Sequence, residues 1–111
     1  MSLNIVSVNQ FNKELKTLYK RYKNIGRDIK HLKSILSENP KAGIALAHNC
    51  YKIRLANSSV PTGKSGGFRV IYYYIDQDGT VYLLSIYSKS DIANVSDEKI
   101  LGILKREGII E

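Results

Sequence analysis

Residues 68–87 read FRVIYYYIDQDGTVYLLSIY, and this stretch decides the fold. Both of its ends are rich in the β-branched and aromatic residues that favour strands, and Asp78-Gly79 between them is typical of a tight turn. We therefore expect a strand from about Phe68 to Ile75, a turn over 76–79 and a strand from about Thr80 to Tyr87. The domain is built around this antiparallel hairpin.

A further strand precedes the hairpin. Tyr51, Ile53 and Leu55 alternate with Lys52 and Arg54, so one face of this strand is apolar and the other carries two cations. The sequence PTGKSGG over 61–67 predicts a loop between this strand and Phe68.

The N-terminal part of the chain predicts one strand and two helices. Leu3 to Val8 favours extended structure, and Asn9 follows as a residue that starts helices. Apolar residues then recur at helical spacing in two stretches, Phe11, Leu15, Leu18 and Tyr22, and then Ile25, Ile29, Leu32 and Leu36. Asn39-Pro40 ends the second helix, because the residue before proline avoids helical geometry. Two helices with so short a join form an antiparallel pair.

The remaining elements complete an α+β domain over residues 1–111. We expect a loop over 41–49 and a last helix that starts at Ser96 and stops at Gly108. The order strand, helix, helix, three strands, helix predicts a mostly antiparallel four-stranded sheet with the helical hairpin on one face. We expect the other face to be open for function.

Composition places the chain among ordinary globular proteins. Hydrophobic residues make up 43% and charged residues 24% of its 111 residues. The single cysteine, Cys50, cannot form an internal disulfide, and the first residues lack the pattern of a secretory signal. The longest apolar runs are far below the roughly 20 residues that cross a bilayer. We expect a cytoplasmic protein without contact to membranes.

Charge indicates the class of partner. The net charge is +7, and one stretch between Glu38 and Asp76 has no carboxylate at all. The cations of this stretch are Lys41, Lys52, Arg54, Lys64 and Arg69. Tyrosines 72–74 follow directly, and cations beside aromatic residues suit a polyanion with stackable bases. The sequence therefore favours RNA or DNA over a neutral small molecule.

Two motifs invite other interpretations. Gly63-Lys64-Ser65 resembles a phosphate loop, but position 58 is Ser58 where that motif needs glycine, and a strand follows where it needs a helix. We interpret it as a basic loop able to approach a phosphate backbone, or as an ordinary solvated loop. His31, His48 and Cys50 are scattered, so we expect no metal and no acyl-transfer chemistry. Cys50 is more typical of a small buried hydrophobe.

Arg69 and Tyr87 are candidate site residues because of their positions in the sequence. Arg69 lies among apolar neighbours, where an arginine is costly unless it forms a buried ion pair or faces a site. Tyr87 ends a strand, and we expect its side chain to be accessible and to share a face with Lys89 if the strand extends. Of tyrosines 72–74, one or two are expected to face the core.

Three segments carry a family resemblance. They are YKIRL over 51–55, GKSGGFRVIYY over 63–73 and LSIYSK over 84–89 followed by Asp91, in that order before a C-terminal helix. In this arrangement the chain resembles the RelE and HigB family of bacterial toxins, which are small mRNA endoribonucleases of toxin–antitoxin modules. The resemblance covers positions 51–104 well and the helical hairpin by pattern alone.

The resemblance implies RNA cleavage without a metal or other cofactor, in which the ribose 2′-OH attacks the adjacent phosphorus. It assigns phosphorane stabilisation to Arg69, phosphate binding and 2′-OH activation to Arg54 and Lys52, and stacking or proton transfer to Tyr87. Lys64 and Lys89 would be supporting RNA-binding cations. The implied partners are mRNA, the ribosome and a cognate antitoxin, expected to be a short helix-turn-helix protein.

One departure from the family affects the acid and base. Some relatives place a histidine near the C-terminal end of the sheet, but this chain has none after His48. Lys52 or Tyr87 could replace it only with a lowered pKa, which we expect the local positive charge to favour. Two alternatives to the toxin therefore stay open, a RelE-like domain that binds nucleic acid or a partner without catalysis, and a structural subunit that grips an acidic protein.

Overall fold

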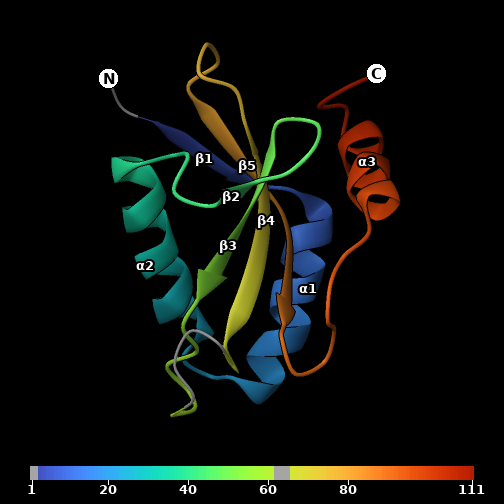
Figure 1. The fold of residues 1–111 in the computed structure, drawn as a ribbon. Coiled ribbons are helices and arrows are strands. Elements are labelled where there is room, and N and C mark those ends of the chain that lie inside the picture. The colour runs from blue at the N-terminus through green and yellow to red at the C-terminus, as the bar shows by residue number, and fades with distance from the viewer. Residues whose placement is uncertain (1–2, 62–65) are drawn as a thin grey trace.

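The computed structural model describes residues 3–61 and 66–111, which form three helices and a five-stranded sheet (Figure 1). The elements are β1 (Asn4–Ser7), α1 (Asn9–Arg21), α2 (Ile25–Glu38), β2 (Ile44–Ala45), β3 (Cys50–Leu55), β4 (Phe68–Tyr74), β5 (Thr80–Ser88) and α3 (Asp97–Arg106). The strand order is β1-β5-β4-β3-β2. β1 pairs in parallel with β5, and every other pairing is antiparallel.

The central hairpin of β4 and β5 forms as its sequence predicts. Gly79 in its turn has φ +65, a left-handed conformation that glycine adopts without steric cost. A register shift follows Ile71, so β5 carries one extra residue relative to β4. The predicted α+β fold class is confirmed.

The sheet has five strands, so the predicted number of four is wrong. The extra strand, β2, lies within the expected 41–49 loop and pairs Ile44 with Lys52 and Ala45 with Tyr51. A strand of two residues has no alternating pattern to predict it, because such a pattern needs about four. β2 therefore covers only the first part of the outer edge of β3.

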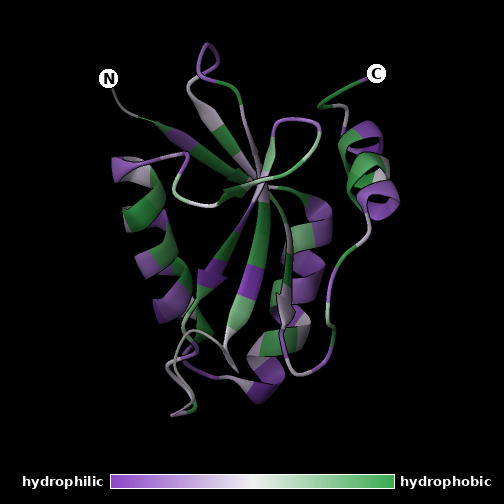
Figure 2. Cartoon of the chain, viewed as in Figure 1, coloured by the Kyte–Doolittle hydropathy of each residue, from purple (hydrophilic) through white to green (hydrophobic). Residues whose placement is uncertain are grey.

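The helical hairpin covers one face of the sheet, as expected. Hydrophobic and hydrophilic residues alternate along both helices (Figure 2), and their apolar stripes belong to the core. Tyr22 after α1 meets Phe68 of β4 edge to face, with ring centroids 5.4 Å apart. Glu14 fixes α1 beside β5, because its carboxylate accepts hydrogen bonds from Ser85 Oγ at 2.8 Å and from the Ile86 N–H at 3.3 Å. No helix in the described part of the chain is long and apolar enough to span a membrane.

The opposite face of the sheet is partly covered, which corrects the expectation that it is open. Ile71 and Tyr73 point away from the helical hairpin, yet only 1% and 6% of their surfaces are exposed. The cover comes from α3, whose buried side chains Ile100, Ile103 and Leu104 belong to the same core. Figure 1 shows α3 on the side of the sheet away from α2. Only the part of this face beyond α3 remains for a site.

Tyrosines 72–74 are all buried, although one or two were expected in the core. Tyr72 is completely buried, stacks on Tyr51 with ring centroids 5.2 Å apart, and accepts a hydrogen bond from the Gly43 N–H at 3.1 Å. Tyr73 and Tyr74 are 6% and 9% exposed. None of the three is therefore placed to stack on a base, and this part of the argument for nucleic acid was wrong.

Ser96 caps α3, and its removal gives a first prediction. Its side chain accepts a hydrogen bond from the Lys99 N–H at 3.2 Å, which satisfies one of the unpaired donors at the start of the helix. Ser96→Ala should lower the free energy of unfolding by about 1 kcal/mol. Urea denaturation followed by circular dichroism measures this, with Ser34→Ala on the exposed side of α2 as the control. Equal stability of the two variants would contradict the cap.

Candidate active site

Three predicted site residues lie in one row across the sheet. Arg54 of β3 is directly opposite Arg69 of β4, and Arg69 is directly opposite Tyr87 of β5. Side chains at directly opposite positions share a face, with about 5 Å between neighbouring residues. This row, Arg54–Arg69–Tyr87, therefore presents two guanidinium groups and a phenol from three strands within about 10 Å.

The two arginines of the row favour an anionic ligand. Like charges directly opposite each other destabilise a sheet, by roughly 0.2–1 kcal/mol in comparable pairs. Arg69 is also 6% exposed, and its Nη1 donates to the Phe68 carbonyl at 3.2 Å. An anion bound between the two guanidinium groups would offset the repulsion between them.

Close backbone packing sets the position of the row. A Cβ on Gly67 would lie 2.3 Å from the Leu55 carbonyl oxygen, so only glycine lets β3 and β4 approach here. The connection after β3 is tied to α2, because the buried carboxylate of Asp28 accepts the Ser58 N–H at 3.1 Å. Arg54 and Arg69 are therefore presented by a fixed pair of strands.

The lysines expected at the site, Lys52 for catalysis and Lys64 and Lys89 as supporting cations, differ in where they lie. Lys52 lies on the same face as Arg54, two residues along β3, and its Nζ donates to Asn94 Oδ1 at 3.4 Å. Lys89 lies just beyond β5, and its Nζ donates to the Ala93 carbonyl at 3.1 Å. Lys64 lies outside the described residues. Lys52 thus lies beside the row on the same face of the sheet, whereas Lys89 lies at the margin of the row.

Tyr87 is buried, although we expected it to be accessible. It is 3% exposed, and its hydroxyl has no hydrogen-bond partner among the described residues. A buried hydroxyl without a partner costs about 1–3 kcal/mol, so the position is not explained by packing alone. The Tyr87 hydroxyl therefore has capacity for a ligand.

The pKa of Tyr87 is raised above its ordinary value, where we expected it to be lowered. Burial is the larger cause, and the positive charge of Arg69 opposes it. In the structure as it stands, the phenol is therefore protonated at neutral pH and suits the role of a proton donor better than that of a base.

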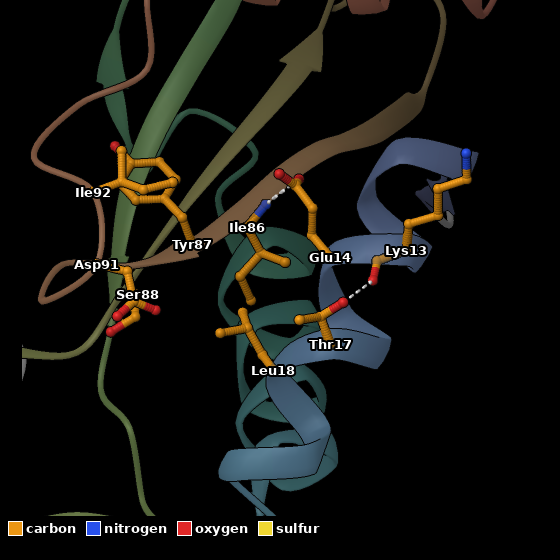
Figure 3. Close-up of a pocket in the computed structure, with 9 residues that line it drawn as sticks. All are labelled: Lys13, Glu14, Thr17, Leu18, Ile86, Tyr87, Ser88, Asp91 and Ile92. Carbon is orange, nitrogen blue, oxygen red and sulfur yellow. Dashed lines mark hydrogen bonds between the residues drawn. The ribbon is translucent and has the colours of Figure 1, made fainter.

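A cavity of about 240 Å³ adjoins Tyr87 at the edge of β5 (Figure 3). Leu18 and Ile86 form its apolar side, and Tyr87, Asp91 and Ile92 lie at its other end. A second hollow of about 560 Å³ lies on the other side of the row, where it is lined by Lys52, Arg54 and apolar residues of α2 and β2. The row therefore lies between two concave surfaces.

Residues 89–95, which we call the strap, join β5 to α3 and complete the surroundings of the row. Sequence reasoning gave no role to Asn94 or to Arg21, whose Nη1 lies 2.7 Å from Asp91 Oδ2. No local pattern indicates these contacts, because each joins residues that are 42 to 70 positions apart. Only the tertiary fold brings the strap over the sheet.

The scattered histidines and cysteine do not contribute to the row. His31 is exposed on α2, and His48 is exposed in the turn before β3. Cys50 is completely buried, as expected, and burial raises the pKa of its thiol to about 12. This thiol is therefore protonated and unreactive at neutral pH.

Comparison with solved structures identifies the fold. A double mutant of the Escherichia coli toxin RelE in the free state matches with a TM-score of 0.61 at 20% sequence identity, over 96% of this chain and 98% of that chain. The isolated E. coli RelE toxin matches with a TM-score of 0.51 at 22% identity, over 94% and 98% of the two chains. A RelE mutant in complex with a peptide of the antitoxin RelB matches with a TM-score of 0.50 at 21% identity, over 92% and 93%.

These matches span nearly the full length of both chains, and they agree with the element order and the sheet described above. No family model matches the sequence. The common property is therefore the architecture, and the chain has the RelE-like toxin fold.

Proposed function

We propose that this protein is the toxin of a type II toxin–antitoxin module and acts as an endoribonuclease on mRNA. The Arg54–Arg69–Tyr87 row carries the proposal, because three strands of a RelE-like fold present two guanidinium groups and a phenol at one place. Guanidinium groups bind phosphate through paired N–H donors, which suits a phosphodiester better than a neutral substrate.

The proposed reaction is a transfer within the RNA chain. The ribose 2′-oxygen forms a bond to the adjacent phosphorus, and the bond from phosphorus to the 5′-oxygen of the next nucleotide breaks. The 2′-OH loses its proton to a base, and the departing 5′-oxygen takes a proton from an acid. The products are a 2′,3′-cyclic phosphate and a 5′-hydroxyl, and no metal ion is needed.

The roles follow from the positions of the side chains. Arg69, in the centre of the row, would stabilise the negative charge that develops on the phosphorane. Arg54 and Lys52 would bind the phosphate and assist removal of the 2′-OH proton. Tyr87, whose pKa is raised by burial, would donate the proton to the 5′-oxygen. Lys89 and Lys64 would be supporting RNA-binding cations.

The partners of the proposed function are mRNA on the translating ribosome and an antitoxin. A RelE mutant has been solved with a peptide of the antitoxin RelB, and its fold matches this chain. We therefore propose a cognate antitoxin, encoded beside this chain as a short helix-turn-helix protein, that covers the row in the cytoplasm.

A second candidate function is a domain that binds RNA or a partner without cleaving it. The observation that favours it is the absence of histidine after His48, together with the raised pKa of Tyr87, which leaves the base to Lys52. Such a domain would bind RNA with the strong salt dependence of phosphate contacts and would leave the strand intact.

Induced expression of the chain without antitoxin tests the proposal. We expect arrest of growth, and primer extension on total mRNA should show new 5′ ends within translated reading frames. Purified protein should then cleave a defined mRNA when translating ribosomes are supplied. Normal growth with soluble protein, or salt-sensitive RNA binding without any cut, would contradict the toxin and favour the second candidate.

A further inference from the structure

Two of the three side chains of the row are buried in this structure, whereas Arg54 is exposed. Arg69 and Tyr87 are 6% and 3% exposed, so little of either side chain is open to a phosphodiester chain. If the row receives a substrate, some segment above it has to move. The sheet itself cannot, because β3, β4 and β5 are paired along the row.

The strap lies near Tyr87 and contacts Lys52, on the two sides of the strand that carries Arg69. It leaves β5 through a turn in which the Ser88 carbonyl accepts the N–H groups of Asp91 and Ile92 at 3.0 and 3.1 Å. Ile92 and Tyr87 line the same cavity (Figure 3). Two residues later Asn94 reaches Lys52 on β3. The strap therefore reaches from the end of β5 to the Lys52 side chain of β3, and β4, which carries Arg69, lies between these two strands.

Weak contacts hold the strap down. The Arg21–Asp91 ion pair is 2.7 Å long, but its side chains are 52% and 41% exposed, and such pairs contribute little to stability. The Lys52–Asn94 hydrogen bond is long, at 3.4 Å. Ile92 is 38% exposed, so it is only partly anchored, whereas Val95 at the end of the strap is buried. The strap is thus fixed at its ends and loosely held between them.

Both contacts use a cation that a phosphate would attract. Arg21 holds a carboxylate and Lys52 holds an amide oxygen, and RNA phosphates offer the same donors a charged partner. The strap and a polyanion would therefore compete for the side chains of Arg21 and Lys52.

We propose that the strap is a gate over the row, which RNA opens by exchanging its phosphates for Asp91 on Arg21 and for Asn94 on Lys52. This gate rests on the proposed function. Asp91 and Asn94 are positioning residues in this scheme, since neither contacts the reacting atoms. They set the fraction of molecules in which Arg69 and Tyr87 can be reached, and the apparent affinity for RNA falls with that fraction.

Opening would also change the chemistry of Tyr87. Burial is the cause that raises the pKa of the phenol, and the charge of Arg69 acts against it. Removal of the strap would reduce the first effect and keep the second. The proton of Tyr87 would then be given up more readily in the open molecule than in the closed one.

Hydrogen exchange of the whole chain tests the gate, with Asp91→Ala as the variant. The matched control is Asp76→Ala, which breaks the exposed Lys41–Asp76 pair of 2.8 Å at the far end of β4 and changes the net charge equally. Amides of the strap should exchange roughly two- to fivefold faster in Asp91→Ala, as expected for the loss of one exposed pair. They should keep the wild-type rate in Asp76→Ala.

A short oligodeoxynucleotide, which has phosphates but no 2′-OH, is the probe of opening. Its addition to the wild-type protein should speed exchange in the strap while exchange in α3 stays constant. In cleavage assays, Asp91→Ala should lower KM roughly two- to fivefold relative to Asp76→Ala, with kcat little changed. Equal strap exchange in the two variants, or slower strap exchange with the oligodeoxynucleotide, would overturn the gate.

The outcomes separate the gate from the proposed function. If the strap opens with the oligodeoxynucleotide and no RNA is cut, the gate stands and the endoribonuclease proposal fails. If RNA is cut and the strap shows no response to Asp91→Ala or to the oligodeoxynucleotide, the endoribonuclease stands and the gate fails.

Discussion

Arg69→Ala should abolish growth arrest and lower the rate of RNA cleavage by about a hundredfold or more, as removal of one preorganised charge donor does in other enzymes. Arg69 occupies the centre of the row, with Arg54 on one side and Tyr87 on the other. No other described cation lies directly opposite both of these residues, so none can take over its position. Primer extension on a ribosome-bound mRNA measures the loss.

Two comparisons keep this prediction specific. Arg27→Ala removes an exposed arginine from α2 and changes the net charge equally, so it should cleave at the wild-type rate. Because Arg69 is buried, circular dichroism and thermal melting must show that Arg69→Ala is folded. Arg69→Lys provides a second variant that keeps the charge and loses the paired N–H donors, and it should remain at least tenfold slower. A folded Arg69→Ala protein with wild-type activity would exclude the row as the active site.

Gly67→Ala should be the most damaging single substitution for stability outside the apolar core. The new Cβ would lie 2.3 Å from the Leu55 carbonyl oxygen and 3.1 Å from the Asn57 backbone nitrogen, and neither atom belongs to a flexible side chain. β3 and β4 would have to separate at the row, at a cost of ~3 kcal/mol or more. Urea denaturation measures this cost, and RNA cleavage should fall as the strands part.

The matched control for Gly67 is Gly102, which lies within α3 and has open space where a Cβ would be placed. Gly102→Ala should raise the free energy of unfolding by up to about 1 kcal/mol, because alanine favours the helix. The two glycine substitutions are thus expected to have opposite signs. Equal effects would show that the approach of β3 to β4 does not depend on glycine.

The sequence predicted the helices and strands whose apolar residues recur at a regular spacing. The alternation around Lys52 and Arg54 and the apolar run before Asp78-Gly79 both correspond to observed strands, β3 and β4. The stripes of α1 and α2 predicted their buried residues for the same reason. The shared face of Lys52 and Arg54 was predicted from their alternation, whereas the register that sets Arg54 opposite Arg69 came from the structure.

The burial of Tyr87 was not accessible from sequence. Tyr87 ends a strand beside polar residues, and such a pattern predicts exposure. In the structure Tyr87 is buried and lines a cavity together with Ile92 of the strap, which also reaches Lys52 on β3. Contacts between distant segments produce no periodic pattern in the sequence. The position of the strap and the direction of the shift in the Tyr87 pKa could therefore be obtained only from the folded structure.

The chemistry of the cut ends tests the central claim most directly. Purified protein should be supplied with translating ribosomes and with two mRNAs that differ by one 2′-deoxy nucleotide on the 5′ side of the cleavage site. The row of Arg54, Arg69 and Tyr87 predicts that the all-ribose mRNA yields a 2′,3′-cyclic phosphate and a 5′-hydroxyl, and that the deoxy-substituted mRNA is not cut there. Cleavage of both mRNAs at that site, or products with a 5′-phosphate, would contradict attack by the 2′-OH.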